Sequence, residues 1–197
     1  MSAASPTSAR KPSARDRLLA AADELFYAEG VHTVGIDRII ERAGVAKASL
    51  YSTFGSKDEL VRAYLEGRHE IRRARLLAGL ERFDGPRERL LGVFEVLAEV
   101  AGTPGFRGCA FYNASAESAP GGPAEQVSTA NRAWTRGLLT ELARDAGAPD
   151  PAALAEQLIV LYDGATVGAR MDHGPAAART ARAMAAILLD ATNPAAS

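Results

Sequence analysis

Alanine dominates this sequence, and the residues that favour β-strands are scarce. The 197 residues include 41 Ala but only 16 Val and Ile together. Alanine has the highest helix propensity, whereas strands favour β-branched side chains. No segment alternates apolar and polar residues over the length of a strand, and the nearest approach to a hairpin turn, Asp84-Gly85, leads into Pro86 and a helical pattern. The sequence therefore predicts an all-α fold.

Glycine and proline divide the chain into about nine predicted helices. A capping pattern, Ser13-x-x-Asp16, starts the first helix, and Gly30 ends it. A second capping pattern, Ser56-x-x-Glu59, opens a long helix over residues 57–82. The remaining predicted helices span residues 36–43, 47–53, 86–102, 107–118, 125–146, 152–171 and 176–191. Residues 1–13, rich in Ser, Ala and Pro, are expected to form a disordered arm.

Charge, hydropathy and cysteine content exclude several classes of protein. Lys and Arg number 23 against 24 Asp and Glu, giving a formal net charge of −1, so nucleic-acid binding requires a local basic patch. No apolar run reaches the roughly 18 residues of a membrane span, and no secretory signal is evident. The single cysteine, Cys109, excludes an internal disulfide and suits a reducing cytoplasm. No histidine is followed by a ligand partner three or four residues later on the same predicted helix, so we expect no metal site.

Two short predicted helices, 36–43 and 47–53, flank the segment Gly44-Val45-Ala46. This spacing is typical of a helix-turn-helix, and glycine can adopt a left-handed turn without steric cost. We expect four apolar side chains to be buried together: Ile40, Val45, Leu50 and Phe54. The exposed face then consists of Lys47, Ala48, Ser49, Tyr51 and Ser52. Such a small polar face suits a major groove about 12 Å wide.

The same segment is basic. Residues 42–57 contain three basic side chains and no acidic one, for a local charge of +3. Phosphate contacts need a concentration of cationic donors of this kind. Three basic residues in such a stretch are also compatible with an ordinary solvated surface. The helix-turn-helix spacing favours the DNA-binding interpretation.

Residues 15–60 resemble the DNA-binding domain of the tetracycline-repressor (TetR) family of bacterial transcriptional regulators. The resemblance rests on three motifs at the family spacing: Ala43-Gly44-Val45, Leu50-Tyr51-x-x-Phe54 and Ser56-Lys57-x-Glu59-Leu60. It implies a helix-turn-helix domain over residues 14–60 and a ligand-binding and dimerisation domain over residues 61–197. The implied protein is a cytoplasmic homodimeric repressor without a cofactor, which binds a near-palindromic double-stranded DNA operator and is released by a small apolar effector.

The resemblance also assigns roles to single residues near the DNA. It places Lys47, Ala48, Ser49 and Ser52 at base edges or the neighbouring sugar and phosphate. Phosphate contacts are implied for Thr33, Tyr51 and Lys57. Two positions depart from the family pattern: Thr53 replaces the usual His or Tyr, and Gly35 stands where Ser or Thr is usual. These departures remove one aromatic or imidazole side chain and one capping hydroxyl.

The C-terminal region contains scattered aromatic residues and a pair of small residues. Converging aromatic and polar side chains would suit a ligand pocket, although they could equally fill the core; the candidates are Phe106, Phe111, Asn113, Trp134, Tyr162 and Asp163. Gly164 and Gly168 lie one turn apart and allow close helix packing, either across a dimer axis or within the subunit. With Met184 and Leu188 of the last predicted helix, they are the candidate dimer interface. Cys109 is expected to be a small buried residue and not a redox sensor.

Two other classes of function compete with a DNA-binding regulator. An all-α enzyme could use the same cavity, but the Gly-x-Ser-x-Gly, Gly-x-x-x-x-Gly-Lys and His-Glu-x-x-His motifs are missing from the sequence, and we expect no catalytic residues. A dimeric interaction protein that has lost DNA binding is the third interpretation, and the departures at Thr53 and Gly35 support it slightly. Retardation of DNA by the purified protein distinguishes the regulator from both.

Overall fold

A computed structural model describes residues 11–192, and this part of the chain forms nine helices and no strand. The prediction of an all-α fold is therefore confirmed. The helices are α1 (Ala14–Glu29), α2 (Ile36–Ala43), α3 (Lys47–Phe54), α4 (Lys57–Leu80), α5 (Pro86–Ala101), α6 (Ala110–Glu117), α7 (Pro123–Asp145), α8 (Pro151–Met171) and α9 (Ala176–Thr192). Most of the arm predicted over residues 1–13 lies outside the described residues.

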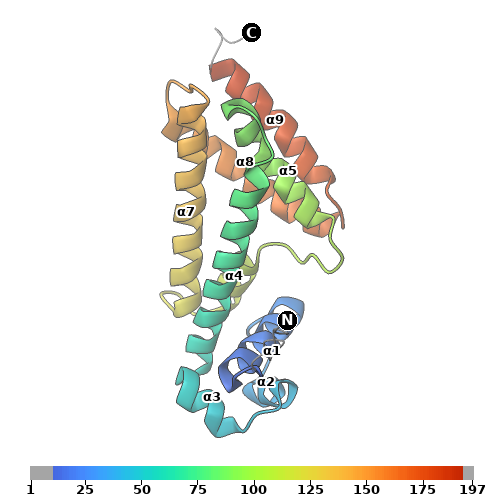
Figure 1. The fold of residues 1–197 in the computed structure, drawn as a ribbon, viewed down its shortest axis with the longest axis vertical. Helices are drawn as coiled ribbons and strands as arrows, with labels where there is room; N and C mark the ends of the chain where they lie inside the picture. The colour runs from blue at the N-terminus through green and yellow to red at the C-terminus, as the bar shows by residue number, and fades with distance from the viewer. Residues whose placement is uncertain (1–10, 193–197) are drawn as a thin grey trace, which may run out of the picture.

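The helices form two groups joined by α4. Helices α1 to α3 gather at one end of the elongated molecule, and α4 runs from this end into a bundle with α5, α7, α8 and α9 (Figure 1). The short helix α6 packs against α7 and α4 between the two groups. Since α4 belongs to both groups, a tilt of this helix would move one group relative to the other.

Local capping chemistry sets the starts of α1 and α4. The Ser13 hydroxyl accepts the N–H of Asp16 at 3.1 Å, and the Ser13 N–H donates to the Asp16 carboxylate at 3.0 Å, which completes the predicted capping box. At α4, the Ser56 hydroxyl accepts the N–H of Glu59 at 3.1 Å. The Glu59 carboxylate pairs with Arg62 at 3.1 Å, so only half of the second predicted box is made.

The start of α6 differs from the prediction. A helix was expected from residue 107, but the structure has a loop up to Cys109 and begins α6 at Ala110. Gly105 and Gly108 have positive φ values of 80° and 82°, which a continuing right-handed helix does not allow. The Cys109 Sγ accepts the N–H of Tyr112 at 3.5 Å and caps the shortened helix.

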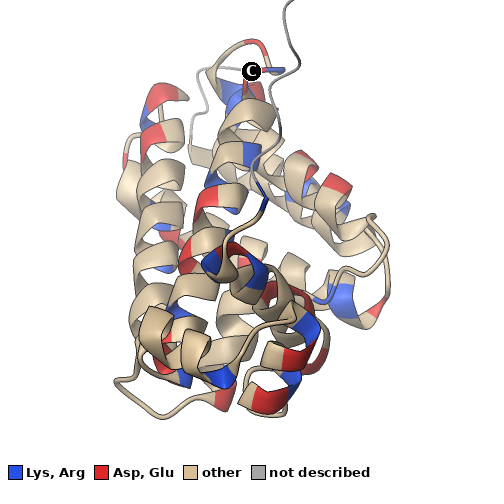
Figure 2. Ribbon diagram, turned by 60° about the horizontal axis from the view of Figure 1, so that its bottom comes forward, with Lys and Arg blue, Asp and Glu red and all other residues tan. Residues whose placement is uncertain are grey.

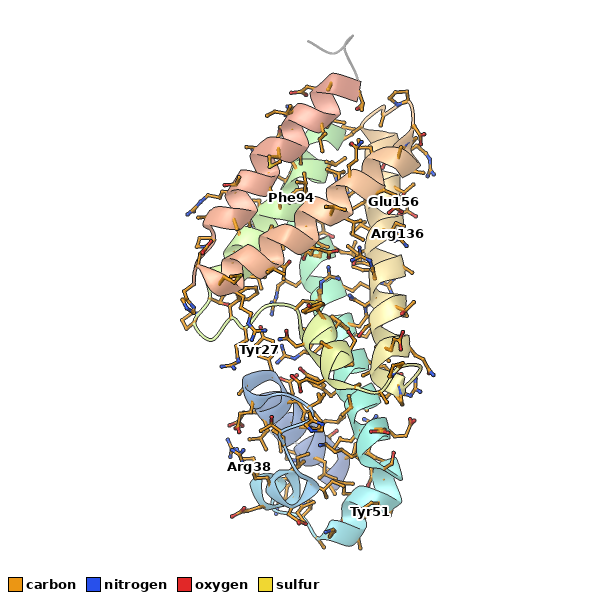
Figure 3. All side chains as sticks on the ribbon, turned by 180° about the vertical axis from the view of Figure 1, so that it is seen from behind. Tyr27, Arg38, Tyr51, Phe94, Arg136 and Glu156 are labelled. Atoms are coloured by element: carbon orange, nitrogen blue, oxygen red, sulfur yellow. The ribbon has the colours of Figure 1, made fainter. Side chains whose placement is uncertain are left out.

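Two apolar cores hold the helices together. The smaller core joins α1, α2 and α3 to the first half of α4, to α6 and to the start of α7; its members include Leu18, Phe26, Ile39, Leu50, Leu65, Phe111 and Val127. The larger core fills the bundle, where Phe94 is fully buried among α5, α8 and α9 (Figure 3). Because the smaller core includes α6, it continues beyond residue 60. The boundary between two domains at that residue stays a prediction.

Candidate DNA-binding surface and ligand cavity

The turn between α2 and α3 has the geometry that a helix-turn-helix requires. Gly44 adopts the left-handed conformation, with φ 61° and ψ 46°, as predicted for this glycine. Arg17 of α1 donates from Nη1 to the Gly44 carbonyl oxygen at 3.1 Å. The Val45 N–H donates to the Ile40 carbonyl oxygen at 3.1 Å. These bonds fix the direction in which α3 leaves the turn.

Helix α3 presents one face to the core and the other to solvent. Leu50 is fully buried, and partly buried Ile40, Val45 and Phe54 pack against the same core, close to the prediction. The Tyr51 side chain is 46% exposed and lies at the outer end of the molecule (Figure 3). The other exposed candidates are Thr33, Lys47, Ala48 and Ser52, whereas Ser49 and Lys57 are half-buried. Ser49 was expected on the exposed face and is more covered than predicted.

Acidic side chains from other helices pair with the predicted basic patch. Lys47 binds Asp37 of α2 with 2.9 Å between Nζ and Oδ1, and this hydrogen bond raises the pKa of Lys47 above its usual value. Arg42 pairs with Glu24 of α1 at 2.7 Å. Lys57 donates to a backbone carbonyl oxygen, that of His32, at 3.4 Å. Basic and acidic segments are accordingly interleaved over this end of the molecule (Figure 2), and the local charge of +3 overstates the field there.

Arginines of α1 contribute to this surface, and the sequence interpretation did not include them. Arg17 supports the turn, and the Arg15 guanidinium lies 5.7 Å from the centre of the Phe54 ring. Neither role can be found from spacing along the sequence, because both depend on how α1 packs across α2 and α3.

A cavity of about 960 Å³ lies between the bundle and α1. Its walls come from α1, α4, α5, α6, α7, α8 and the loop before α6. Five of the six predicted ligand-binding residues line it: Phe106, Phe111, Asn113, Tyr162 and Asp163. Trp134 is not among the residues that line this cavity, so the structure does not bring it together with the other five. Its ring lies behind the wall, 5.6 Å from the His69 ring and 5.8 Å from the Arg72 guanidinium.

Arginines of α4 dominate one wall of the cavity, and the sequence interpretation missed them. Arg68, Arg72 and Arg75 are spaced by four and three residues, which places them on one face of the helix. This spacing is visible in the sequence and could have identified them. Arg68 pairs with Asp23 of α1 through two hydrogen bonds of 2.6 and 2.9 Å. Burial lowers the pKa of Arg72, but interactions with Tyr162, Cys109 and Asp163 together outweigh burial and raise that pKa overall.

The cavity wall also includes part of the helix-turn-helix group. Asp23 and Tyr27 of α1 line the cavity, and Tyr27 lies beneath the loop before α6 (Figure 3). The Tyr27 hydroxyl accepts the N–H of Arg107 at 2.9 Å and donates to the Gly108 carbonyl oxygen at 3.2 Å. A molecule in the cavity would therefore touch the helix that supports the turn between α2 and α3.

Helices α8 and α9 expose large apolar side chains, namely Val160, Val167 and Met171 of α8 and Met184 and Ile187 of α9. Val167 and Met171 also line the cavity. Gly164 lies on the same side of α8, and a Cβ there would meet open space. Gly168 differs, because its Cβ would lie 2.8 Å from the Ala177 Cβ of α9 in the same subunit. Leu188 is partly buried against the internal core. Of the four predicted interface residues, only Gly164 and Met184 belong to the exposed face.

The two glycines are expected to respond differently to alanine. Gly168→Ala should lower the free energy of unfolding by about 1–2 kcal/mol, because the added methyl group overpacks the contact with α9. Gly164→Ala should raise it by up to about 1 kcal/mol, since alanine is the better helix former and the site is open. Urea unfolding followed by circular dichroism measures both. Equal changes in the two variants would contradict the assignment of Gly168 to packing within the subunit.

Among residues 11–192, no helix is both long and apolar enough to cross a membrane. Within the same range, no three or more His, Cys, Asp or Glu side chains gather where they could hold a metal ion.

The fold and its exposed α3 define a class, the helical transcriptional regulators with an N-terminal helix-turn-helix. The family model described as "Bacterial regulatory proteins, tetR family" matches residues 18–64. SCO4454, a TetR-family transcriptional regulator from Streptomyces coelicolor, is 36% identical with a TM-score of 0.84, over 91% of this chain and 95% of that one. The chain therefore belongs to the TetR family of transcriptional regulators.

Other relatives agree with this membership. A TetR-type regulator from Streptomyces avermitilis is 36% identical with a TM-score of 0.83, over 92% of this chain and 99% of that one. The transcriptional activator FasR from Mycolicibacterium smegmatis is 50% identical over 52 residues, which is 26% of this chain and 24% of FasR. The regulator SrpR from Pseudomonas putida is 37% identical over 62 residues, 32% of this chain and 29% of SrpR. The matches thus span only about a quarter of these two curated relatives.

Proposed function

We propose that the protein is a homodimeric, ligand-responsive repressor that acts in the cytoplasm by binding and without catalysis. It binds a near-palindromic operator through α3 and releases it when a small molecule occupies the cavity. The observation that supports this most directly is the shared wall: α1 supports the DNA-binding turn through Arg17 and lines the cavity through Asp23 and Tyr27.

The proposed DNA contacts centre on the exposed face of α3. Lys47, Ala48 and Ser52 would approach base edges, with Ser49 beside them, and Tyr51, Lys57 and Thr33 would bind phosphates. Lys47 must exchange its bond to Asp37 for one to DNA, so part of its binding energy offsets the broken ion pair. Such contacts are made twice, because one dimer presents two recognition helices to two half-sites about one helical turn apart.

The ligand switch is proposed to work through α4 and α1 together. A ligand shifts an equilibrium only by its difference in affinity for the two states, so it must bind the DNA-incompetent conformation more tightly. About 100-fold, or ~2.7 kcal/mol, would give useful release. The cavity touches α4 over Arg68 to Leu76, while the first turn of α4 holds Lys57 at the DNA end. A tilt of α4 would change the separation of the two recognition helices.

The test of this function begins with the DNA itself. Random duplex fragments retained by the purified protein are sequenced, and the enriched site is used in gel retardation at moderate salt. A near-palindromic site supports the proposal, and failure to retain any sequence above background overturns it. Transcription in vitro from a promoter that contains the site then shows whether the protein represses or activates. A repressor lowers the yield of transcript, whereas an activator raises it; the relative FasR is named as an activator.

We expect Lys47→Ala and Tyr51→Phe each to weaken operator binding. One lost contact of this type costs about 1–3 kcal/mol when it involves a base edge and less when it involves a phosphate. Both side chains are exposed, so circular dichroism and sedimentation should show an unchanged fold and oligomeric state. Gel retardation with the selected operator measures the affinity.

Two controls make this prediction specific. Arg144→Ala removes an exposed cation from the far end of α7 and should leave operator affinity unchanged. Asp37→Asn should strengthen binding slightly, since it removes the carboxylate that competes with DNA for Lys47. Wild-type affinity in both the Lys47→Ala and Tyr51→Phe proteins would show that α3 is not the recognition helix.

A further inference from the structure

The cavity is strongly cationic although the protein as a whole carries a net charge of −1. Its lining contains two aspartates and five arginines, and these are the charged residues among those that line it: Asp23, Asp163, Arg68, Arg72, Arg75, Arg132 and Arg170. The lining therefore carries a formal charge of +3. A cavity built only to hold an apolar molecule gains nothing from this excess, because each guanidinium loses hydration there.

The two aspartates neutralise two of the arginines. Asp23 is bound by Arg68 of α4, and Asp163 of α8 forms an ion pair with Arg132 of α7. Arg170 donates to the amide oxygen of Asn113 at 2.8 Å, which is a neutral partner. The remaining excess positive charge on α4 comes from Arg72 and Arg75.

Arg72 is the most enclosed of the unpaired cations. Its Nη1 donates to the Asn131 side-chain oxygen and to the Thr135 hydroxyl, both at 3.1 Å, and both partners are buried and neutral. Among the described residues, no carboxylate forms an ion pair with Arg72 or with Arg75, one turn further along α4. A guanidinium has five donors in a planar fork, and the bonds to Asn131 and Thr135 engage only one of its nitrogens. The Tyr162 side chain is a further partner of Arg72.

Other residues of the lining are apolar. Buried Leu97 of α5, Phe111 of α6 and Ile159 of α8 contribute hydrocarbon surface to the same cavity. An occupant that satisfies both parts needs an anionic end and an apolar body. Planar guanidinium groups bind carboxylate and phosphate oxygens in paired hydrogen bonds, so an oxyanion matches the unpaired arginines.

We propose that the cavity binds an amphiphile with one oxyanion head group, a carboxylate or a phosphate monoester, held by Arg72 and Arg75. Its apolar body lies among Leu97, Phe111 and Ile159. This assignment names the chemical class of the effector, and it rests on the proposed function for the role of the bound molecule as an effector. The effector expected from the sequence was mainly apolar, and this proposal adds an anionic head group, because the arginines on one face of α4 favour an anion.

The experiment compares four ligands with the same hydrocarbon tail and different head groups. Decanoate, decyl phosphate, decanol and decylammonium are titrated into the full-length protein below their micelle concentrations, without DNA. Calorimetry gives the affinity, and the fluorescence of Trp134, the only tryptophan, reports occupancy because its ring is 5.8 Å from Arg72. We expect at least one of the two anions to bind about tenfold or more tightly than decanol, and decylammonium to bind weakest. The stronger anion identifies the head group.

Variants test whether Arg72 supplies the preference. Arg72→Gln keeps amide donors for Asn131 and Thr135 but loses the charge, so anion affinity should fall about tenfold while decanol affinity stays the same. Arg72→Lys should retain part of the preference. Arg73→Gln is the matched control, because it removes a cation from the same helix outside the cavity lining. If Arg72→Gln fails to fold, the same change in anion affinity is measured with Arg75→Gln, because Arg75 is exposed.

Two results would overturn the inference: equal binding of decanol and both anions, or an Arg72→Gln protein whose anion affinity matches that of Arg73→Gln. Because these titrations contain no DNA, they are independent of the operator experiment. If the protein retains a palindromic operator but shows no anion preference, the proposed function stands and this inference is wrong. If it prefers anions but retains no DNA, the inference about the cavity stands and the proposed function is wrong.

Discussion

Ile187→Glu is expected to convert the proposed dimer into monomers and to lower operator affinity at least about a hundredfold. The Ile187 side chain is 68% exposed on α9, and Met184, three residues earlier on the same helix, is 48% exposed. Placing a carboxylate in an apolar interface leaves a buried charge without a partner, which a dimer of this kind does not tolerate. Two linked half-site contacts exceed one by about 10²–10⁴ in affinity, and that factor is lost with the dimer. Sedimentation velocity and gel retardation measure the two effects.

The control for this variant is an exposed apolar residue outside α8 and α9. Leu77 of α4 is 40% exposed, and Leu77→Glu should leave both the dimer and operator binding unchanged. On DNA that carries a single half-site, Ile187→Glu and the wild-type protein should bind with similar, weak affinity, because each recognition helix is intact. A dimeric Ile187→Glu protein would place the subunit interface on another face.

Features set by neighbouring residues in the chain were predictable from the sequence. The Ser13 capping box, the left-handed Gly44 and the buried Leu50 were all predicted and are all present. Each depends on backbone geometry or apolar spacing over a few residues. The same kind of signal misplaced the start of α6, because the positive φ of Gly108 interrupts a pattern that otherwise continues as a helix.

Features that depend on packing between helices were not predictable. The count of basic residues around α3 could not include Asp37 and Glu24, which reach Lys47 and Arg42 from other helices. Trp134 was a reasonable pocket residue by type, but the orientation of α7 places its ring behind Arg72. The spacing of the arginines on α4 is visible in the sequence. That Asp163 pairs with Arg132 and not with Arg72 becomes visible only once the facing helices are placed.

Gly44→Val is the second large effect that we expect. With φ at 61°, residue 44 is in the left-handed region, where a β-branched side chain clashes with its own backbone. The free energy of unfolding should fall by about 2–3 kcal/mol. The destabilised segment is the turn that orients α3. Space is not the cause, because the nearest atom to a Cβ would be the Arg17 Nη1 at 3.8 Å. Operator binding should be lost while sedimentation still shows a dimer, since the larger core and the α8–α9 face are distant from the turn.

Two variants separate backbone strain from the bulk of the new side chain. Gly44→Asn should retain most of the stability and operator affinity, because asparagine tolerates the left-handed conformation far better than valine. Gly67→Val introduces the same side chain at an exposed position of α4 with nothing within 4 Å of the new Cβ, and it should be harmless. Hydrogen exchange localises the effect: the amides of α2 and α3 should lose protection in Gly44→Val, whereas those of α5 and α9 should not. If Gly44→Asn lowered stability and operator affinity as much as Gly44→Val, backbone strain at φ 61° could not be the cause. Glycine would then be needed at this position for a contact that is made only with DNA.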